Sequence, residues 1–363
     1  MKRILVIFST LVTSIVLINS ILRIYLVTPD FYTTDTAEMN QKWNLFQQHK
    51  HDVDILFIGT SRTDLHIDPK HIIVEDPIGN RLKSLNIGIR GIRFPELIHL
   101  ANKSLENTDS NLKFLVIEIT DVFNKYSNGK MARSDSWIKM GEMDWIFDKI
   151  DCDAPSQVYA IKYKLIYLYN LILKQFDFSF LHRKIDPDAH EKPYMKMSNH
   201  GFISLNIDAL EDSLNEMMNN GSKSYINTTR RTIQKHIDLL SDTSRLTLLK
   251  NQTVNALRDT LEFRKCHTSI LNRLNDLIEK GEQKGVRVIY LLPVRFHQLL
   301  KEEIPVWNKL NSCHKINMVD PDKYSEFYDL KYSFDLIHLN DRGAELYSRR
   351  LSDDFQKLIL NCN

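Results

Sequence analysis

Short apolar runs that end in glycine, proline or a polar turn constrain this fold more than any other feature. The run at 54–60 (DILFIGT) is apolar without alternation and closes on glycine, which is typical of a strand buried on both faces of a sheet. The run at 286–293 is rich in β-branched residues and ends in proline. Five such runs, the last of them weak, lie at residues 54–60, 84–89, 112–120, 286–293 and 316–322.

Helical patterns lie between these runs. One follows the second run at 94–105, and another precedes the fourth at 268–285, where apolar residues recur on one face. The last helix begins at Asn340 or Asp341, either of which can cap it. Strands that alternate with helices predict an α/β fold of three layers, α/β/α, with a five-stranded parallel sheet.

The alternation stops between Phe123 and about Lys265, which predicts a long helical insertion at about 124–265. Inside it, the segment Val158–Phe176 is apolar and aromatic nearly all round. Two interpretations fit this helix. Either it is buried in an inserted subdomain, or it lies on a membrane surface or against a membrane partner, with tyrosine and lysine at the interface.

The N-terminus carries an uncharged run from Ile4 to Leu22, preceded by Lys2 and Arg3. As a helix, this run is long enough to span the hydrocarbon core of a bilayer. No small-residue cleavage site follows, so the sequence favours an uncleaved signal anchor over a cleaved signal peptide or a buried core helix. The basic residues before the run predict a cytoplasmic N-terminus and a single pass through the inner or cytoplasmic membrane. The predicted parts are an anchor at 1–27, a stem at 28–51 and an extracytoplasmic, periplasmic domain at 52–363.

The charge balance argues against a nucleic-acid partner. The chain has 48 basic and 46 acidic residues and a formal net charge of +2, without a strongly basic domain. Its four cysteines show no C-x-x-C spacing, which argues against zinc, and no other metal or cofactor motif occurs. Cys313 and Cys362 either pair in an exported domain or remain free and buried.

The first strand supplies a candidate nucleophile. In an open parallel sheet, ligands bind beyond the carboxyl ends of the strands. The first strand ends in FIGTSRTD, where Ser61 follows Gly59 by two residues. This order is that of a strand, a sharp turn and a helix around a reactive serine, although Thr63 stands where a second glycine is usual. The alternative is that Ser61 merely caps the next helix.

A candidate base and its orienting acid lie close to the other end of the chain. Asp335 and His338 are three residues apart, just before the last helix. This spacing allows both side chains to face the same way, so His338 can take a proton from Ser61 while Asp335 holds the ring in its tautomer. The alternative is a solvated loop pair or a helix cap.

The second strand end supplies further candidates. It reads LNIGIRGIRFPE, and the backbone N–H of Gly91 is expected to face an oxyanion. Three arginines follow strand ends, namely Arg62, Arg90 and Arg295. They are expected to bind an anionic glycan or phosphate, or else to be ordinary surface charge.

Together these elements resemble the SGNH/GDSL hydrolase superfamily. The resemblance covers about residues 52–122 and 286–360, and its blocks are Gly59-Thr60-Ser61-Arg62, Asn86 to Gly91, and Asp335 with His338. It resembles in particular the membrane-anchored branch that works on cell-envelope polymers, which includes polysaccharide O-acetyltransferase components and the D-alanyl transfer protein of teichoic acids. The resemblance implies a flavodoxin-like SGNH fold, a Ser61–His338–Asp335 triad, and oxyanion donors at Gly91 and Asn86.

One block departs from the family pattern. The third strand runs VIEITDVF, so Thr120 and Asp121 stand where the family usually has a G-x-N-D asparagine. Loss of one oxyanion donor costs on the order of 10²–10³ in rate. Either Asn86 or Thr120 replaces the donor, or a partner completes the site, or the activity is weak. Glu118 is expected to lie inside the strand with a structural role.

The resemblance leads to one expected function and two alternatives. The expected function is that of a membrane-anchored SGNH-like serine acyltransferase, without a cofactor. It would act on ester-linked acyl groups, in the first place acetyl, of an extracytoplasmic cell-envelope polysaccharide. The expected partners are this glycan, the membrane and a polytopic O-acyltransferase. The alternatives are an O-acyl esterase with the same triad, and a catalytically silent scaffold that binds glycan or a membrane partner.

Overall fold

The computed structural model describes residues 2–26, 37–92, 94–107, 109–119, 143–174, 197–220, 223–258, 262–294 and 300–362. The chain divides into two compact units. The first comprises Met1–Trp43 and Lys125–Glu191, and the second comprises Asn44–Asn124 and Lys192–Asn363. The predicted insertion at about 124–265 is therefore split between the two units rather than forming one subdomain.

The second unit contains a five-stranded, all-parallel sheet, as predicted. Strands β1 and β3 are paired centrally, with Phe57 opposite Val116, and β1 also pairs with β2. The order β2-β1-β3-β4-β5 is that of doubly wound, flavodoxin-like sheets. The strands are β1 (Ile55–Ile58), β2 (Ser84–Asn86), β3 (Phe114–Glu118), β4 (Arg287–Leu292) and β5 (Lys315–Asn317).

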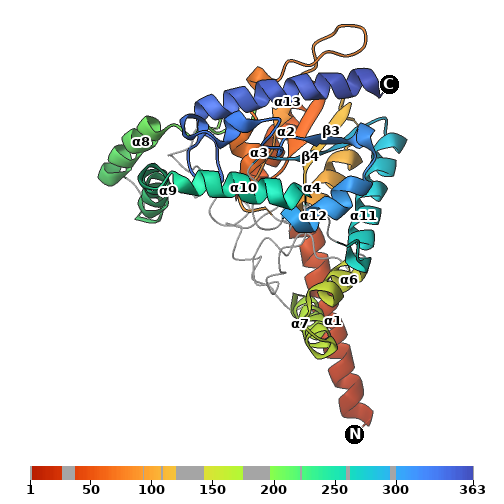
Figure 1. Cartoon of the computed structure of the whole chain (residues 1–363). Helices are drawn as coiled ribbons and strands as arrows, with labels where there is room; N and C mark the ends of the chain where they lie inside the picture. The colour runs from red at the N-terminus through yellow and green to blue at the C-terminus, as the bar shows by residue number, and fades with distance from the viewer. Residues whose placement is uncertain are drawn as a thin grey trace. The chain divides into compact units, whose positions relative to one another are not determined.

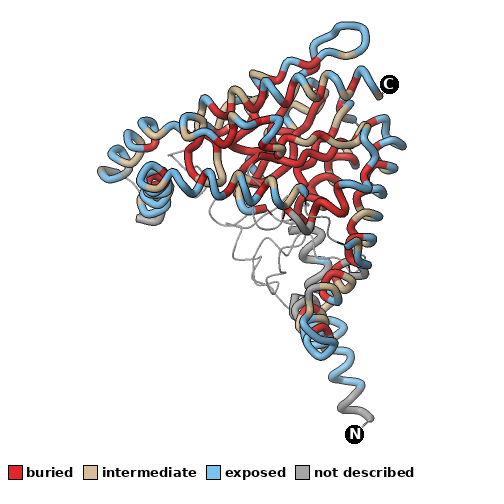
Figure 2. Tube along the Cα trace, in the orientation of Figure 1, coloured by how far each residue is buried: buried red, intermediate tan, exposed pale blue. Residues whose placement is uncertain are grey.

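Helices cover both faces of this sheet (Figure 1). On one face, Phe57 and Ile289 belong to a buried cluster with Leu351 of α13 (Asp341–Asn361). On the other face, α4 (Phe94–Glu106) lies against β1 and β3, and α11 (Lys265–Gln283) lies against β4. The Tyr290 hydroxyl donates to the Leu274 carbonyl of α11 over 2.7 Å. The strands are buried on both sides, as their continuous apolar runs require (Figure 2).

Shorter elements and further helices complete the second unit. The side chain of Asn340 caps α13 by accepting from the Gly343 amide over 3.0 Å, so the predicted start of the last helix is confirmed. The remaining elements of this unit are α3 (Ser61–His66), η2 (Pro69–His71), α8 (Ile207–Asn220), α9 (Lys223–Ser241), α10 (Ser244–Arg258), α12 (Leu300–Lys309), η5 (Ser312–His314), η6 (Ser325–Tyr328) and η7 (Leu330–Tyr332). Helix α2 (Ala37–His49) contains the boundary between the units.

The first unit contains the predicted apolar helix, now α7 (Gln157–Lys174), which packs against α6 (Met143–Asp153). Its outer face is not buried, because Val158 is 75% exposed and Leu165 is 59% exposed (Figure 2). The interpretation of this helix as buried is therefore wrong for that face. The alternative, contact with a membrane surface or a membrane partner, stays a prediction.

The predicted membrane anchor falls on α1 (Lys2–Leu26), which is helical. Across the residues that the structure describes, no helix has both the length and the apolarity that crossing a membrane requires. The anchor, its orientation and the periplasmic location of the domain therefore stay predictions.

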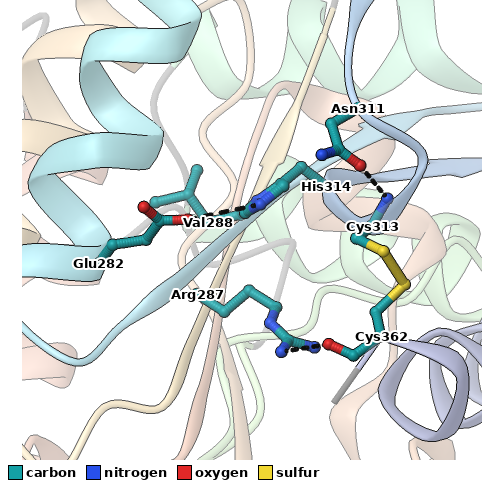
Figure 3. Close-up of a disulfide and its surroundings, with 7 residues drawn as sticks. All are labelled: Glu282, Arg287, Val288, Asn311, Cys313, His314 and Cys362. Carbon is teal, nitrogen blue, oxygen red and sulfur yellow. Dashed lines mark hydrogen bonds and ion pairs between the residues drawn. A yellow bond between two sulfur atoms is a disulfide. The ribbon is translucent and has the colours of Figure 1, made fainter.

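A disulfide joins the end of α13 to the segment that precedes β5 (Figure 3). Cys313 and Cys362 are bonded, with their Cα atoms 5.6 Å apart, and no cysteine in the described part of the chain is free. The Arg287 side chain donates to the Cys362 carbonyl over 2.8 Å, and the Asn311 side chain accepts from the Cys313 amide over 2.9 Å. Of the two alternatives for these cysteines, the pairing is the one found.

Removal of this disulfide in a Cys313→Ala/Cys362→Ala variant is expected to lower the free energy of unfolding by about 2–4 kcal/mol. The bond closes a loop with a sequence separation of 49, which restricts the unfolded chain. Urea denaturation of the oxidised wild type and the variant measures the difference. Each single variant should match the double variant, since either one breaks the same bond. An unchanged unfolding midpoint would contradict the prediction.

Candidate active site

A sharp turn at the carboxyl end of β1 places Ser61 as the first residue of α3, with Thr60 as its N-cap. Gly59 enables this turn because no side chain fits there. A Cβ atom on Gly59 would lie 1.8 Å from the Thr63 hydroxyl oxygen and 2.5 Å from a carboxylate oxygen of Glu118. The G-x-S pattern thus reflects close packing at the position of the serine.

Ser61 meets the predicted base and acid. The Nε2 atom of His338 lies 2.8 Å from the Ser61 hydroxyl oxygen, and its Nδ1 atom lies 3.0 and 3.1 Å from the two carboxylate oxygens of Asp335. The contacts run in the order serine, histidine, aspartate, with each ring nitrogen facing a different residue. This is the geometry in which a histidine can accept a hydroxyl proton while a carboxylate holds its ring.

The surroundings of the Asp335 carboxyl favour its ionised form. One of its oxygens also accepts from the backbone amides of Ile337 and His338, each over 2.7 Å. Burial by itself raises the pKa of the Asp335 carboxyl, but the neighbouring charge of His338 and these hydrogen bonds outweigh it, so the pKa lies below its ordinary value. An ionised Asp335 can accept from Nδ1 of His338, which leaves Nε2 to face Ser61.

Replacement of Asp335 with asparagine is expected to destabilise the fold more at pH 7 than at low pH. The folded-state pKa lies below the unfolded value of about 3.9, so the ionised carboxyl stabilises the fold above about pH 4. This contribution is lost as the pH falls towards the folded-state pKa. The difference in the free energy of unfolding between wild type and D335N, measured in urea, should therefore shrink below about pH 4.

The control for this prediction is Asp353→Asn, at an exposed position of α13. Because this side chain is exposed, its replacement should change the free energy of unfolding little. A D335N difference that stayed constant down to pH 3 would contradict the stabilising role of the ionised carboxyl.

Asn86 does not act as predicted. Its side chain is fully buried, and its amide nitrogen donates to the backbone carbonyls of Thr63 and Ile67, each over 2.7 Å. Its amide oxygen accepts from the Gly88 amide over 2.8 Å. Because both N–H groups are already used, Asn86 has no donor left for an oxyanion. The structure assigns it a different task, which is to tie α3 to the end of β2.

The backbone of the serine itself offers a donor. In the first turn of α3, the amide of Arg62 bonds to the Thr60 hydroxyl and the amide of Asp64 bonds to the Thr60 carbonyl. The amide of Thr63 bonds to Glu118. The amide of Ser61 has no hydrogen-bond partner among the residues that the structure describes. Gly91 lies exposed in the turn after β2 with a φ of 68°, and its expected oxyanion role stays a prediction.

The three predicted arginines are placed differently from one another. Arg62 is buried, and its Nε atom lies 3.0 Å from a carboxylate oxygen of Glu118, so it is part of the interior rather than a surface ligand. Arg90 is partly buried, with its Nε atom 3.4 Å from a carboxylate oxygen of Asp64. Arg295 lies outside the described residues, as do Thr120 and Asp121 of the third block.

Sequence reasoning missed His66. This residue is fully buried, and its Nε2 atom accepts from the backbone amide of Leu339 over 3.1 Å. Its ring meets that of His338 edge to face, with centroids 6.1 Å apart. His66 thereby links the end of α3 to the loop that carries the base. Only its position five residues after Ser61 could have pointed to it.

The helices of the insertion in this unit pack directly behind the site. Leu65 of α3 and Phe334, which precedes Asp335, share a buried cluster with Leu210 of α8 and Ile233 of α9. The Nδ1 atom of His236 donates to the Phe334 carbonyl over 2.7 Å. This part of the insertion therefore supports both segments that carry the triad, although the resemblance did not include it.

The fold and the site define a parallel α/β protein with a hydrogen-bonded serine, histidine and aspartate at the carboxyl ends of its strands. Such a site can form and resolve a serine ester. Within the described residues, no group of three or more histidine, cysteine, aspartate or glutamate side chains is arranged to hold a metal ion. No family model, no curated protein and no solved structure matches this chain.

Proposed function

We propose that this chain is a membrane-anchored SGNH-like serine acyltransferase. It acts on ester-linked acyl groups, in the first place acetyl, of an extracytoplasmic cell-envelope polysaccharide. The observation that carries the proposal is the 2.8 Å contact between the Nε2 atom of His338 and the Ser61 hydroxyl, with Asp335 on the other ring nitrogen. The strand order of the sheet and the chain order of the three residues support the family assignment.

The proposed chemistry has two halves. The Ser61 oxygen attacks the acyl carbonyl while His338 takes the hydroxyl proton, and the Ser61 and Gly91 amides stabilise the oxyanion. The tetrahedral intermediate then collapses, and His338 protonates the departing alcohol. In the second half, a hydroxyl of the acceptor gives its proton to His338, attacks the acyl-serine and restores Ser61. Water in place of the acceptor turns the same cycle into ester hydrolysis.

The transferase assignment and the location rest on the sequence. The uncharged run at 4–22 after Lys2 and Arg3 favours an anchor that keeps the site beside a membrane, where a polytopic O-acyltransferase can supply the acyl group. The exposed apolar face of α7 is compatible with work at a membrane surface. The polysaccharide acceptor follows from the family resemblance.

A catalytically silent scaffold is the second candidate. One observation favours it: both N–H groups of Asn86 are occupied, so this candidate replacement for the third-block asparagine has no donor left for an oxyanion. A scaffold would keep the fold and bind glycan or a membrane partner without forming an acyl-serine.

The test is covalent labelling of the folded full chain with a fluorophosphonate probe, followed by peptide mapping. Labelling on Ser61, absent after heat denaturation, supports an enzyme, and no labelling of a folded sample favours the scaffold. An assay with an aryl acetate donor, run with and without an envelope polysaccharide as acceptor, then separates acyl transfer from ester hydrolysis. Acetate found on the glycan indicates transfer. Acetate released only to water indicates an esterase.

A further inference from the structure

Glu118, the last residue of β3, gathers an unusual number of donors around one buried carboxylate. The side chain is fully buried, and both of its oxygens act as acceptors. All the donors come from the turn that carries the nucleophile. They are the Thr60 amide (2.8 Å), the Thr60 hydroxyl (2.8 Å), the Arg62 Nε atom (3.0 Å), the Thr63 amide (3.2 Å) and the Thr63 hydroxyl (2.7 Å).

These bonds bracket Ser61 on both sides. Thr60 precedes the serine and Thr63 follows it by two residues, so one carboxylate sets the backbone before and after the nucleophile. The Thr60 hydroxyl in turn accepts from the Arg62 amide over 3.3 Å. The Ser61 amide is thereby left as the one amide from Thr60 to Asp64 without a partner within the described part of the chain.

The negative charge of Glu118 is neutralised by a buried arginine beside it. Its partner Arg62 is also buried, and the pair is formed next to the serine rather than at the surface. An unpaired buried carboxylate here would oppose the negative charge that develops on an attacked carbonyl. Because Arg62 neutralises it, the Glu118 carboxylate can organise the turn without strongly repelling the oxyanion.

We infer that Glu118 is a positioning residue for the nucleophile. It organises this turn from the last position of β3. It holds the Ser61 hydroxyl towards His338 and keeps the Ser61 amide turned towards the oxyanion. This inference rests on the proposed function, because it assigns a role in the reaction of Ser61.

The test compares Glu118→Gln with Glu326→Gln in the fluorophosphonate reaction of the full chain. Glu326 accepts from the Nε atom of Arg350 over 3.1 Å, so it also pairs with an arginine Nε atom, but at the surface and away from Ser61. E118Q should lower the labelling rate at saturating probe by about 10- to 100-fold, because small displacements of a reacting group cost about that much. The probe concentration at half saturation should change little. E326Q should match the wild type in both quantities.

A milder variant covers the case in which E118Q does not fold. Thr63→Val removes one hydroxyl donor to Glu118 at nearly constant shape, and it should lower the saturating rate in the same direction by a smaller factor. If the wild type reacts but E118Q and T63V both react as fast as E326Q, Glu118 has no positioning role. If the wild type itself does not react, the proposed function fails instead.

Discussion

Replacement of Ser61 with alanine is expected to lower acyl-ester turnover by on the order of 10⁴–10⁶ and to abolish fluorophosphonate labelling. The hydroxyl of this residue lies 2.8 Å from the Nε2 atom of His338, and without it no acyl-serine can form. The substitution removes one oxygen and leaves Glu118, Thr60 and Thr63 in place. The fold should therefore survive, with a circular dichroism spectrum like that of the wild type.

Ser244→Ala is the matched control for this variant. Ser244 also begins a helix, α10, and its hydroxyl bonds to a neighbouring side chain, that of Asp242. S244A should keep wild-type turnover and labelling. Full turnover in S61A would mean that another group carries the reaction, and the triad would then be only a structural contact.

Replacement of His338 with glutamine is expected to lower turnover by on the order of 10⁴, because the serine then has no base to accept its proton. The glutamine side chain can still donate to Asp335, and the backbone amide at 338 still bonds to that carboxylate over 2.7 Å. Loss of activity should thus exceed any loss of stability. Turnover of an aryl acetate and the rate of fluorophosphonate labelling should both fall.

The chain offers a matched control for this prediction as well. Asp68 and His71 are also three residues apart, and the His71 Nε2 atom lies 3.6 Å from an Asp68 carboxylate oxygen. This pair lies at η2 and does not contact Ser61. H71Q should therefore retain turnover. An H338Q variant as active as H71Q would overturn the assignment of His338 as the base.

Much of the fold was predictable because the relevant signal is local. Continuous apolar runs identified β1, β3 and β4, and their alternation with amphipathic helices predicted the parallel sheet and its two helical layers. The start of α13 was predictable because an asparagine cap satisfies amides only three residues away. The helical structure of α7 was also predictable, from its long apolar and aromatic run. The exposure of its apolar face was not.

The triad was also predictable in outline. The chain order of Ser61, Asp335 and His338 and the place of each beside the sheet predicted that they meet. The structure places them in contact. The prediction for Asn86 failed. Sequence spacing placed an amide donor near the site, but whether that amide is free depends on which carbonyls lie beside it.

The sequence by itself determined the parallel sheet, the start of α13 and the three residues that form the hydrogen-bonded triad, because these follow from periodicity, from capping and from the ends of strands. Only the tertiary structure decided what the buried polar groups do. Glu118 meets Thr60, Arg62 and Thr63 from 55 to 58 residues away in the chain, and Asn86 meets Thr63 and Ile67, at the end of α3, across 23 and 19 residues. The partner of a buried donor or acceptor is chosen by packing in space, since a buried polar group without a hydrogen bond is costly once water is excluded.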